Sequence, residues 1–283
     1  MGIQSPDWCN HSWTSWVPFD EAGWDTRLLP KDPGLYRVRA VQRPDVLFYI
    51  GQTGRSLRER LRDLRRNSLS AEMPFNDPHT AAPSLWAWRD AEGYDFECSA
   101  AGLNVSKRER LASECLLLWR HHADVGQSAL CNHGRFHRLY VKSTDRRKGF
   151  RGYRLSDGEP DNTAGGASVA PLKTQGSPLD PDWMGLRWYR TDFSALQPSS
   201  VSANPGVYLI FNDETRETLY IGQTTNLLRR LATHRTKAWG CSASFLYTTM
   251  DGTLPHQLKE LENDLIGAYF DQTGLVPEYQ FRR

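Results

Sequence analysis

The sequence contains one six-residue phrase twice, FYIGQT at residues 48–53 and LYIGQT at residues 219–224. A segment that begins at Pro-Gly precedes each copy, at 33–41 and 205–211, and both segments are rich in β-branched and aromatic residues. Each segment and the phrase after it therefore form a predicted β-hairpin. A chain that repeats a hairpin in this way is expected to build the same small unit twice.

A helix is predicted directly after each hairpin, because side chains that suit a buried face recur every three to four residues. These residues are Leu57, Leu61 and Leu64 in the first copy, and Leu227, Leu231 and His234 in the second. A third strand is predicted at 94–100 and at 242–249, each followed by a second helix. The sequence thus predicts an α+β fold of two modules, each a small antiparallel three-stranded sheet flanked by helices.

The chain of 283 residues is long enough for two domains. Residues 155–182 are rich in Gly, Pro, Ser, Asp and Thr, which is linker composition. We therefore expect a first module with a Trp-rich lead-in at 1–154, a flexible linker at 155–180 and a second module at 181–283.

Charge is unevenly distributed in a chain whose formal net charge is only +2. Positions 55–66 contain six Arg and two acidic residues, and positions 135–154 contain eight Lys or Arg and one Asp. Such runs are commonly solvated faces, and they also suit phosphate. The five scattered cysteines are expected to be reduced thiols.

The sequence shows no membrane-length apolar run and no signal-peptide pattern at its start, so a cytoplasmic location without membrane association is expected. A zinc site is disfavoured, because the Cys and His residues between 115 and 137 lack the paired spacing of a tetrahedral site.

Two carboxylates do not fit the apolar faces on which they lie. At helical spacing Glu114 projects between leucines of the first module, and Glu262 projects between leucines of the second. An ionised carboxylate in such a place is usually paired, bound to metal or protonated. Arg60 and Arg230 lie at the edge of the preceding helices, where they face the hairpin tyrosines. Matched positions in a repeat favour a site over two chance ion pairs.

The order Gly-x-Tyr, Tyr-Ile-Gly, Arg and Glu, present twice, resembles the GIY-YIG nuclease superfamily. In the first copy the residues that match are Tyr36, Tyr49, Arg60, Glu114 and a closing Asn132. In the second copy they are Tyr208, Tyr220, Arg230, His234 and Glu262. The resemblance covers most of both halves and leaves out the lead-ins, the linker and residues 66–90.

This resemblance implies metal-dependent hydrolysis of DNA phosphodiester bonds. Glu114 and Glu262 would each hold one divalent cation, Mg²⁺ or Mn²⁺, and the arginines would stabilise the charge that builds on the phosphate. The first tyrosine of each copy would orient or deprotonate the attacking water, and the second would hydrogen-bond around it. His234 would assist proton transfer, and Asn132 would anchor local structure or a phosphate.

The two copies depart from the family pattern differently. Leu64 occupies the position of His234, and Gln280 occupies the position of Asn132. Asp77 and His79 lie in a proline-bounded loop peculiar to the first half, where His79 could replace the missing helix histidine. In the same insert, Trp86 and Trp88 are predicted to share one face of a strand, covering a small sheet or stacking on an unpaired base.

Two active sites in one chain favour cutting of both strands of double-stranded DNA, as in restriction or defence, by a monomer with an internal pseudo-dimer or by a higher oligomer. One alternative is a single catalytic module joined to a DNA-binding or scaffolding module. The other is a structure-specific repair nuclease that nicks one strand.

Overall fold

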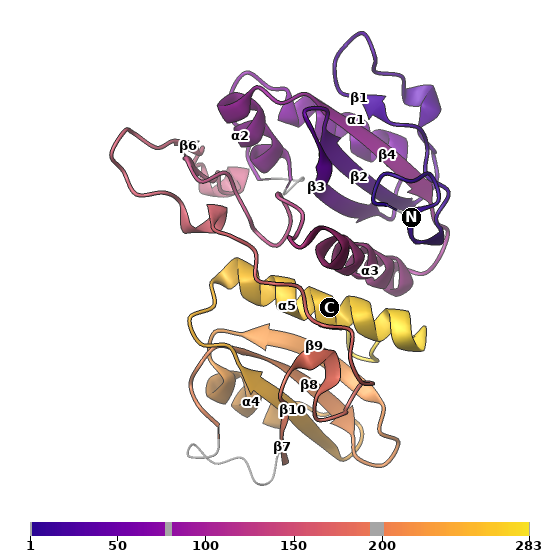
Figure 1. The fold of residues 1–283 in the computed structure, drawn as a ribbon, viewed down its shortest axis with the longest axis vertical. Helices are drawn as coiled ribbons and strands as arrows, with labels where there is room; N and C mark the ends of the chain where they lie inside the picture. The colour runs from indigo at the N-terminus through magenta and orange to yellow at the C-terminus, as the bar shows by residue number, and fades with distance from the viewer. Residues whose placement is uncertain (1, 77–80, 193–200, 283) are drawn as a thin grey trace. The chain divides into compact units, whose positions relative to one another are not determined.

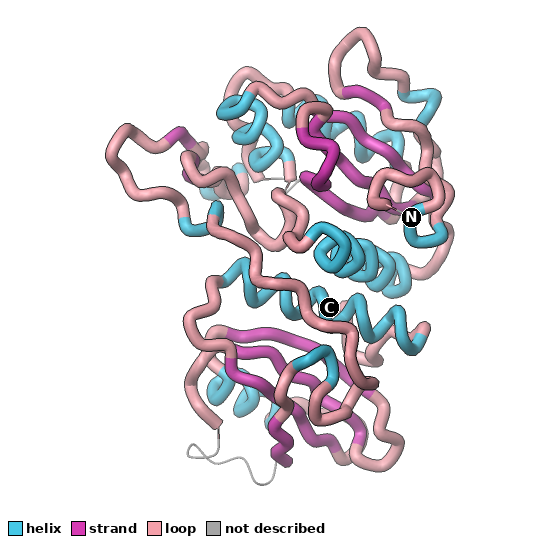
Figure 2. The backbone as a smooth tube through the Cα atoms, in the orientation of Figure 1, coloured by secondary structure: helices cyan, strands magenta, loops and turns pink. Residues whose placement is uncertain are grey.

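The computed structural model describes residues 2–76, 81–192 and 201–282, and Figures 1 and 2 trace its backbone. Asp77 and His79, for which a proline-bounded loop was predicted, fall outside these residues. The chain divides into two compact units. The first comprises Met1–Arg110 and Arg120–Ala167, and the second comprises Leu111–Trp119 and Ser168–Arg283.

The first unit is built on a four-stranded antiparallel sheet with the order β1-β4-β2-β3. Its strands and helices are β1 (Val17–Pro18), β2 (Gly34–Ala40), β3 (Arg43–Thr53), α1 (Leu57–Ser68), α2 (Ala82–Glu92), β4 (Phe96–Gly102), α3 (Lys107–Val125), β5 (Tyr140–Val141) and β6 (Tyr153–Arg154). Short 3-10 turns lie at Trp8–Asn10, Thr26–Leu28, Arg146–Lys148 and Thr163–Gly165. Part of α3, Leu111–Trp119, is grouped with the second unit.

The second unit repeats this plan with a sheet of order β7-β10-β8-β9. Its elements are β7 (Tyr189–Asp192), β8 (Gly206–Asn212), β9 (Thr218–Thr224), α4 (Leu227–Arg235), β10 (Ala243–Thr249) and α5 (Pro255–Thr273), with a 3-10 turn at Trp183–Gly185. Helices and antiparallel sheets occur together in each unit, in agreement with the α+β prediction.

The prediction of three strands per sheet was wrong, because the main sheet of each unit has a fourth strand at its edge. Val17 pairs with Cys98 through β1, and Thr191 pairs with Phe245 through β7. Both strands come from the Trp-rich lead-ins, which the sequence pattern left outside the sheets. The outer edges of β4 and β10 carry backbone groups that need partners, and the lead-ins supply some of them.

The two lead-ins fold alike. The indole Nε1 of Trp13 donates to the carbonyl of Trp8 at 2.9 Å, and that of Trp188 donates to the carbonyl of Trp183 at 2.9 Å. In the first unit the lead-in also covers Arg37 of β2, whose guanidinium lies 4.4 Å from the ring centroid of Trp13. The lead-ins are therefore integral parts of the two units.

The strand predicted for Trp86 and Trp88 was wrong, because both residues lie on α2. Pro83 stands in the first turn of this helix, and Gly93 ends it with a left-handed φ of 69°. Residues two apart lie on different sides of a helix. Accordingly, Trp86 meets Tyr140 with ring centroids 6.1 Å apart, whereas Trp88 stacks on Tyr94.

Alternate side chains of β8 pack on opposite faces of the second sheet. Val207, Leu209 and Phe211 share an apolar core with residues of α5. Tyr208 and Ile210 share another with residues of α4. Helices thus cover both faces (Figure 1), and Tyr208 faces α4.

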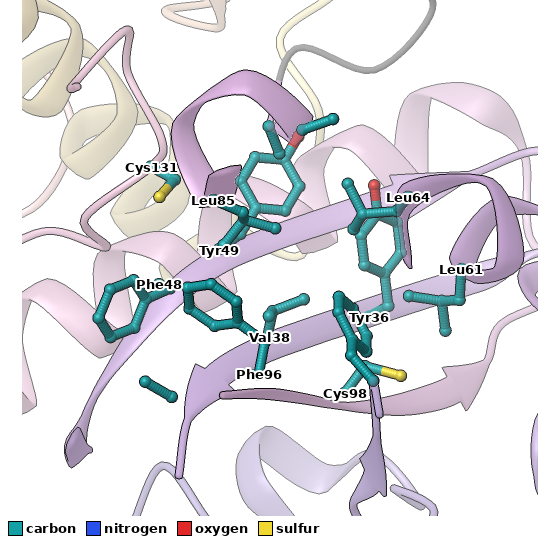
Figure 3. Packing of buried hydrophobic residues seen from close by; sticks show 14 of the residues in the cluster. Tyr36, Val38, Phe48, Tyr49, Leu61, Leu64, Leu85, Phe96, Cys98 and Cys131 are labelled. Carbon is teal, nitrogen blue, oxygen red and sulfur yellow. The ribbon is translucent and has the colours of Figure 1, made fainter. Parts of the chain in front are cut away.

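The first unit shows the same arrangement around α1. Tyr36 and Val38 of β2 pack with Leu61 and Leu64 of the helix, as Figure 3 shows, and all four are buried. Leu57, Leu61 and Leu64 are fully buried, which confirms the predicted apolar face of this helix.

The segment 155–180, predicted to be a linker, makes hydrogen bonds within each unit. In the first unit the amide of Asn162 donates to the carbonyl of Tyr140 at 2.8 Å. In the second unit the backbone N–H of Val169 donates to Glu260 at 2.9 Å. Among the described residues no helix has the length and apolarity needed to cross a membrane.

The glycine of each Tyr-Ile-Gly motif makes room for aromatic rings. Gly51 pairs with Tyr36 across the hairpin, and Gly222 pairs with Tyr208. A Cβ at Gly51 would lie 2.6 Å from atoms of Tyr36 and Tyr49, and a Cβ at Gly222 would lie 2.6 Å from the Tyr208 oxygen. These glycines therefore fix how close the two tyrosines of each hairpin can approach.

Replacing Gly51 with alanine is expected to lower the free energy of unfolding by about 1–3 kcal/mol, because the new methyl group displaces two packed rings. Urea unfolding followed by tryptophan fluorescence measures the change. Gly102→Ala in β4 is the matched control, because the nearest atom to its Cβ would be Asp32 Cβ at 4.0 Å. Equal stability of the two variants would contradict the packing role of Gly51.

Candidate active site

A tyrosine, an arginine and a histidine meet on the α4 face of the second sheet. Arg230 Nε donates to the phenol oxygen of Tyr208 at 2.9 Å. His234 Nε2 lies 2.9 Å from the same oxygen. Tyr208 and His234 are buried. One phenol is thus held between a guanidinium and an imidazole.

The local sequence explains why α4 delivers these two side chains. Asn226 caps the N-terminus of the helix, because its Oδ1 accepts a hydrogen bond from the backbone N–H of Arg229 at 2.9 Å. Leu227 and Leu231 then anchor the helix in the apolar core. Arg230 and His234 are four residues apart and so share one side of the helix. This confirms the prediction that Arg230 faces the hairpin tyrosines.

Tyr220 of β9 completes the aromatic part of the group. Its ring centroid lies 6.1 Å from that of Tyr208 and 5.6 Å from that of His234. Burial and the charge of Glu262 raise the pKa of Tyr220, and Arg230 opposes the rise. Because Gly222 has no side chain, Tyr208 and Tyr220 have the space to approach each other.

Glu262 brings a carboxylate to this group from α5. The side chain is half-buried, and the leucines on either side of it, Leu258 and Leu265, are fully buried. Burial raises the pKa of Glu262 to about 7, although the backbone N–H of Gln223 and the charge of Arg230 lower it. A carboxyl group with this pKa is partly protonated at neutral pH, and a cation beside it would favour the ionised form.

The phenol of Tyr208 stays protonated at neutral pH. Burial raises its pKa, Tyr220 raises it further and Arg230 opposes the rise. Burial lowers the pKa of His234 to about 4, assisted by the charges of Arg230 and Lys237. The imidazole is therefore neutral at neutral pH and has one nitrogen free to accept a proton. Tyr208, Tyr220, Arg230, His234 and Glu262 are called the Tyr208 group below.

The first unit contains a similar group with fewer members. It consists of Tyr36, Tyr49 and Arg60 and is called the Tyr36 group. Arg60 Nε donates to the phenol oxygen of Tyr36 at 3.0 Å. The two tyrosine rings lie 5.9 Å apart at 34°, nearly the geometry of Tyr208 and Tyr220. Figure 3 shows both rings beside Leu64, which stands where the second unit has a histidine. The predicted approach of Arg60 to the hairpin is confirmed.

Glu114, the carboxylate predicted for the first site, is half-buried on α3. It lies in Leu111–Trp119, which is grouped with the second unit, whereas the Tyr36 group belongs to the first. The Tyr36 group is therefore defined by two tyrosines and one arginine, and Glu114 enters only as a proposed partner.

Residues 204–269 match the family model described as the GIY-YIG catalytic domain. The match indicates an endonuclease and implies a DNA substrate. The matched segment contains all residues of the Tyr208 group. It does not include the Tyr36 group, whose resemblance to the family rests on its own residues alone. No curated protein and no solved structure matches the chain significantly.

Beside Arg230 lies a polar cavity of about 460 Å³. Its lining includes Gln223, Thr224, Thr225, Asn226, Arg229, Arg230 and Thr233. Residue type and spacing did not identify Gln223, Asn226 and Arg229 as site residues. Asn226 could have been found as a helix cap, and Arg229 as the second cation in the pair of arginines. The role of Gln223 depends on its backbone N–H, which residue type does not reveal.

Asn132 and Gln280 support the backbone of the Tyr-Ile-Gly strands. Ile50 donates its N–H to Asn132 Oδ1 at 3.0 Å, and Asn132 Nδ2 donates to the carbonyl of Ile50 at 2.8 Å. Ile221 donates to Gln280 Oε1 at 3.0 Å in the same way. Because β3 and β9 are edge strands, these side chains satisfy backbone groups that no neighbouring strand reaches. This geometry supports the anchoring role considered for Asn132.

The described residues include no group of three or more His, Cys, Asp or Glu side chains that could jointly hold a metal ion. GIY-YIG nucleases are generally dependent on a divalent metal. The donor set around the Tyr208 group fits a hard divalent cation held by one carboxylate, because Mg²⁺ commonly keeps several waters and takes one or two protein carboxylates.

The burial of His234 predicts an unusual titration. In the metal-free protein its imidazole is expected to stay neutral down to about pH 4. An unfolded histidine binds a proton near pH 6.5, so acidification from pH 6.5 toward pH 4 should destabilise the second unit. Proton NMR measures the titration of the ring, with His234→Asn identifying its resonance. A midpoint near 6.5 would show that the imidazole is not held as described.

Proposed function

We propose that the protein is a metal-dependent endonuclease that hydrolyses DNA phosphodiester bonds at the Tyr208 group. The observation that carries this proposal is the phenol of Tyr208, held between Arg230 and His234 inside a segment that matches a catalytic domain of nucleases. Glu262 is the proposed metal ligand, with Mg²⁺ or Mn²⁺ as the cation.

Arg230 is placed to bind the phosphate that reacts. Its Nε is engaged with Tyr208, and the guanidinium lines the polar cavity next to Asn226 and Arg229. A guanidinium keeps its charge and can offer two donors to two phosphate oxygens at once. It would therefore stabilise the negative charge that grows on the non-bridging oxygens as the phosphorus becomes five-coordinate.

Tyr208 and His234 are proposed to move the proton of the attacking water. A free phenolate would be scarce at neutral pH, because the pKa of Tyr208 is raised. With the imidazole proton on Nδ1, the Tyr208 hydroxyl donates to His234 Nε2. The phenol oxygen can then take a proton from water while its own proton passes to His234, whose low pKa makes the protonated imidazole short-lived and returns the proton to solvent. The new P–O bond forms to the water oxygen as the P–O3′ bond breaks, and solvent protonates the leaving oxygen.

A divalent cation bound at Glu262 would polarise a phosphate oxygen and help to neutralise the charge of the leaving group. For its own part, Glu262 binds and orients this cation. The backbone N–H of Gln223 lowers the pKa of this carboxyl and so favours its ionised form. Tyr220 packs beside Tyr208, with ring centroids 6.1 Å apart.

The Tyr36 group is proposed to form a second centre with Glu114 as its metal ligand. The Arg60–Tyr36 hydrogen bond, so similar to that of Arg230 and Tyr208, supports this step. Two centres would cut both strands of a DNA duplex, as restriction or defence requires. In this proposal the domains are a first module at 1–154, a connecting segment at 155–180 and a second module at 181–283, in a cytoplasmic enzyme.

A second candidate is a chain with one catalytic module, in which the first module binds DNA. Leu64 in place of a histidine favours this arrangement, because Tyr36 then lacks the imidazole that His234 offers to Tyr208.

Cleavage of supercoiled plasmid by Glu114→Gln, Glu262→Gln and the double variant separates these proposals. With two centres, each single variant should produce nicked circles, and the double variant should be slower by at least about 10³-fold, since several kcal/mol of transition-state stabilisation are lost. Glutamine keeps the shape of the side chain and removes its charge.

Loss of all cleavage in Glu262→Gln with full activity in Glu114→Gln would support the single catalytic module. Nicked circles from the unaltered protein would support a nuclease that cuts one strand. Unchanged cleavage by Glu262→Gln, or equal cleavage with and without a chelator, would overturn the metal-dependent centre.

A further inference from the structure

The structure sorts the long basic run at 135–154 into two classes of side chain. Arg135 is buried and donates to the carbonyl of Ser128 at 2.8 Å. Arg138 pairs with Asp161 at 3.0 Å. Both are thereby explained by the fold of the first unit. The remaining six cations lie on one element, the hairpin of β5 and β6 with its connecting loop.

This element, residues 140–154, is called the basic hairpin. Its cations are Lys142, Arg146, Arg147, Lys148, Arg151 and Arg154, and Asp145 is its one acidic residue. Residues 142–154 therefore carry a formal charge of +5 in a chain whose total is +2. All of these cations except the half-buried Lys142 are exposed. The second unit has no corresponding hairpin among its described elements.

The tip of the basic hairpin is ordered by its own hydrogen bonds. Asp145 accepts from the backbone N–H of Lys148 at 3.1 Å, which uses its carboxylate to cap the 3-10 turn Arg146–Lys148. Gly149 then turns the chain with a φ of 69°. Thr144 donates its N–H to the carbonyl of Phe150 at 3.0 Å and closes the loop.

The base of the basic hairpin is fixed to the body of the first unit. The Tyr140 hydroxyl donates to Asp90 of α2 at 2.5 Å, and its ring is buried against Trp86. Arg151 Nη1 donates to the carbonyl of Met73 at 2.6 Å, and its guanidinium lies over the ring of Phe75. Arg151 also pairs with Glu72 at 3.4 Å. The other five cations repel one another, and because the element is already ordered, binding of a polyanion there costs little entropy for ordering the protein.

Two exposed aromatic rings accompany the charges. Phe150 is 42% exposed and Tyr153 is 48% exposed, and their rings meet edge to face with centroids 6.1 Å apart. Apolar rings in water have an unfavourable hydration that a stacked base or a sugar face relieves. Cations interleaved with exposed aromatic rings match the chemistry of nucleic acids, which combine phosphates with flat bases.

We propose that the basic hairpin binds the phosphate backbone of DNA outside the catalytic centre, with Arg146, Arg147 and Lys148 as its principal phosphate contacts. This inference rests on the proposed function in that the nuclease domain makes DNA the partner. The hairpin holds substrate without taking part in the chemistry, and Phe150 and Tyr153 add contacts that do not depend on charge.

The test uses the full-length protein and a fluorescein-labelled DNA duplex in the presence of a chelator, so that binding is measured without cleavage. Fluorescence anisotropy across a salt series gives the affinity and its salt dependence. Arg146→Ala, Arg147→Ala and Lys148→Ala combined should lower the affinity about 10- to 100-fold at low salt and reduce the logarithmic salt slope by about 3.

The matched control removes three arginines that already pair with carboxylates, the exposed Arg27 and Arg282 and the half-buried Arg43. Arg27→Ala, Arg43→Ala and Arg282→Ala combined make the same change in net charge and should leave the salt slope unchanged. A second variant, Phe150→Ala with Tyr153→Ala, should weaken binding with an unchanged salt slope.

Equal salt slopes for the hairpin variant and the control variant would overturn the inference. If the salt slopes are equal but the unaltered protein still cuts plasmid and Glu262→Gln abolishes this cleavage, the proposed function survives and only the hairpin's role is lost. An unaltered protein that binds no DNA would overturn both. Preferential loss of binding to an RNA duplex, or to vesicles of anionic lipid, would assign the hairpin to another polyanion and also contradict the inference.

Discussion

The hydrogen bond from Arg230 to the buried phenol of Tyr208 is the interaction on which the proposed chemistry depends. The hairpin register sets Tyr208 opposite Gly222, and the missing side chain of that glycine leaves the phenol its place. The Asn226 cap and the buried Leu227 and Leu231 fix the helix that carries Arg230. Because the phenol is buried, its proton stays in place until a partner such as His234 can receive it.

The two units share a sheet order, a lead-in and a tyrosine pair, yet they differ where proton transfer would occur. Arg60 and Tyr36 repeat the hydrogen bond of Arg230 and Tyr208, whereas Leu64 fills the place of His234 with an apolar side chain. A duplicated fold can keep the packing of a site while its chemistry changes, since Leu and His both suit a buried helix face. The basic hairpin adds a further difference, because it belongs to the first unit alone among the described elements.

The sequence could predict the parts of the structure whose cause is local. The hairpins, the apolar faces of α1 and α4 and the approach of Arg60 and Arg230 to the tyrosines follow from residue spacing. The edge strands β1 and β7 could not be found in this way, because they are defined by pairing with a distant strand. The helix around Trp86 could not be predicted in this way, because aromatic residues two apart also match the alternation of a strand. The N–H of Gln223 beside Glu262 depends on the three-dimensional path of the backbone, which residue types do not specify.

The most direct test of the central role of Tyr208 is the single-turnover rate of DNA cleavage by Tyr208→Phe. A Glu114→Gln background removes any contribution of the proposed first centre. The substitution removes one oxygen, so folding and DNA affinity should be kept while the cleavage rate falls about 10²- to 10⁴-fold, the range expected for loss of a proton-transfer group. A rate equal to that of the background protein, with DNA binding intact, would show that the phenol between Arg230 and His234 is not part of the reaction.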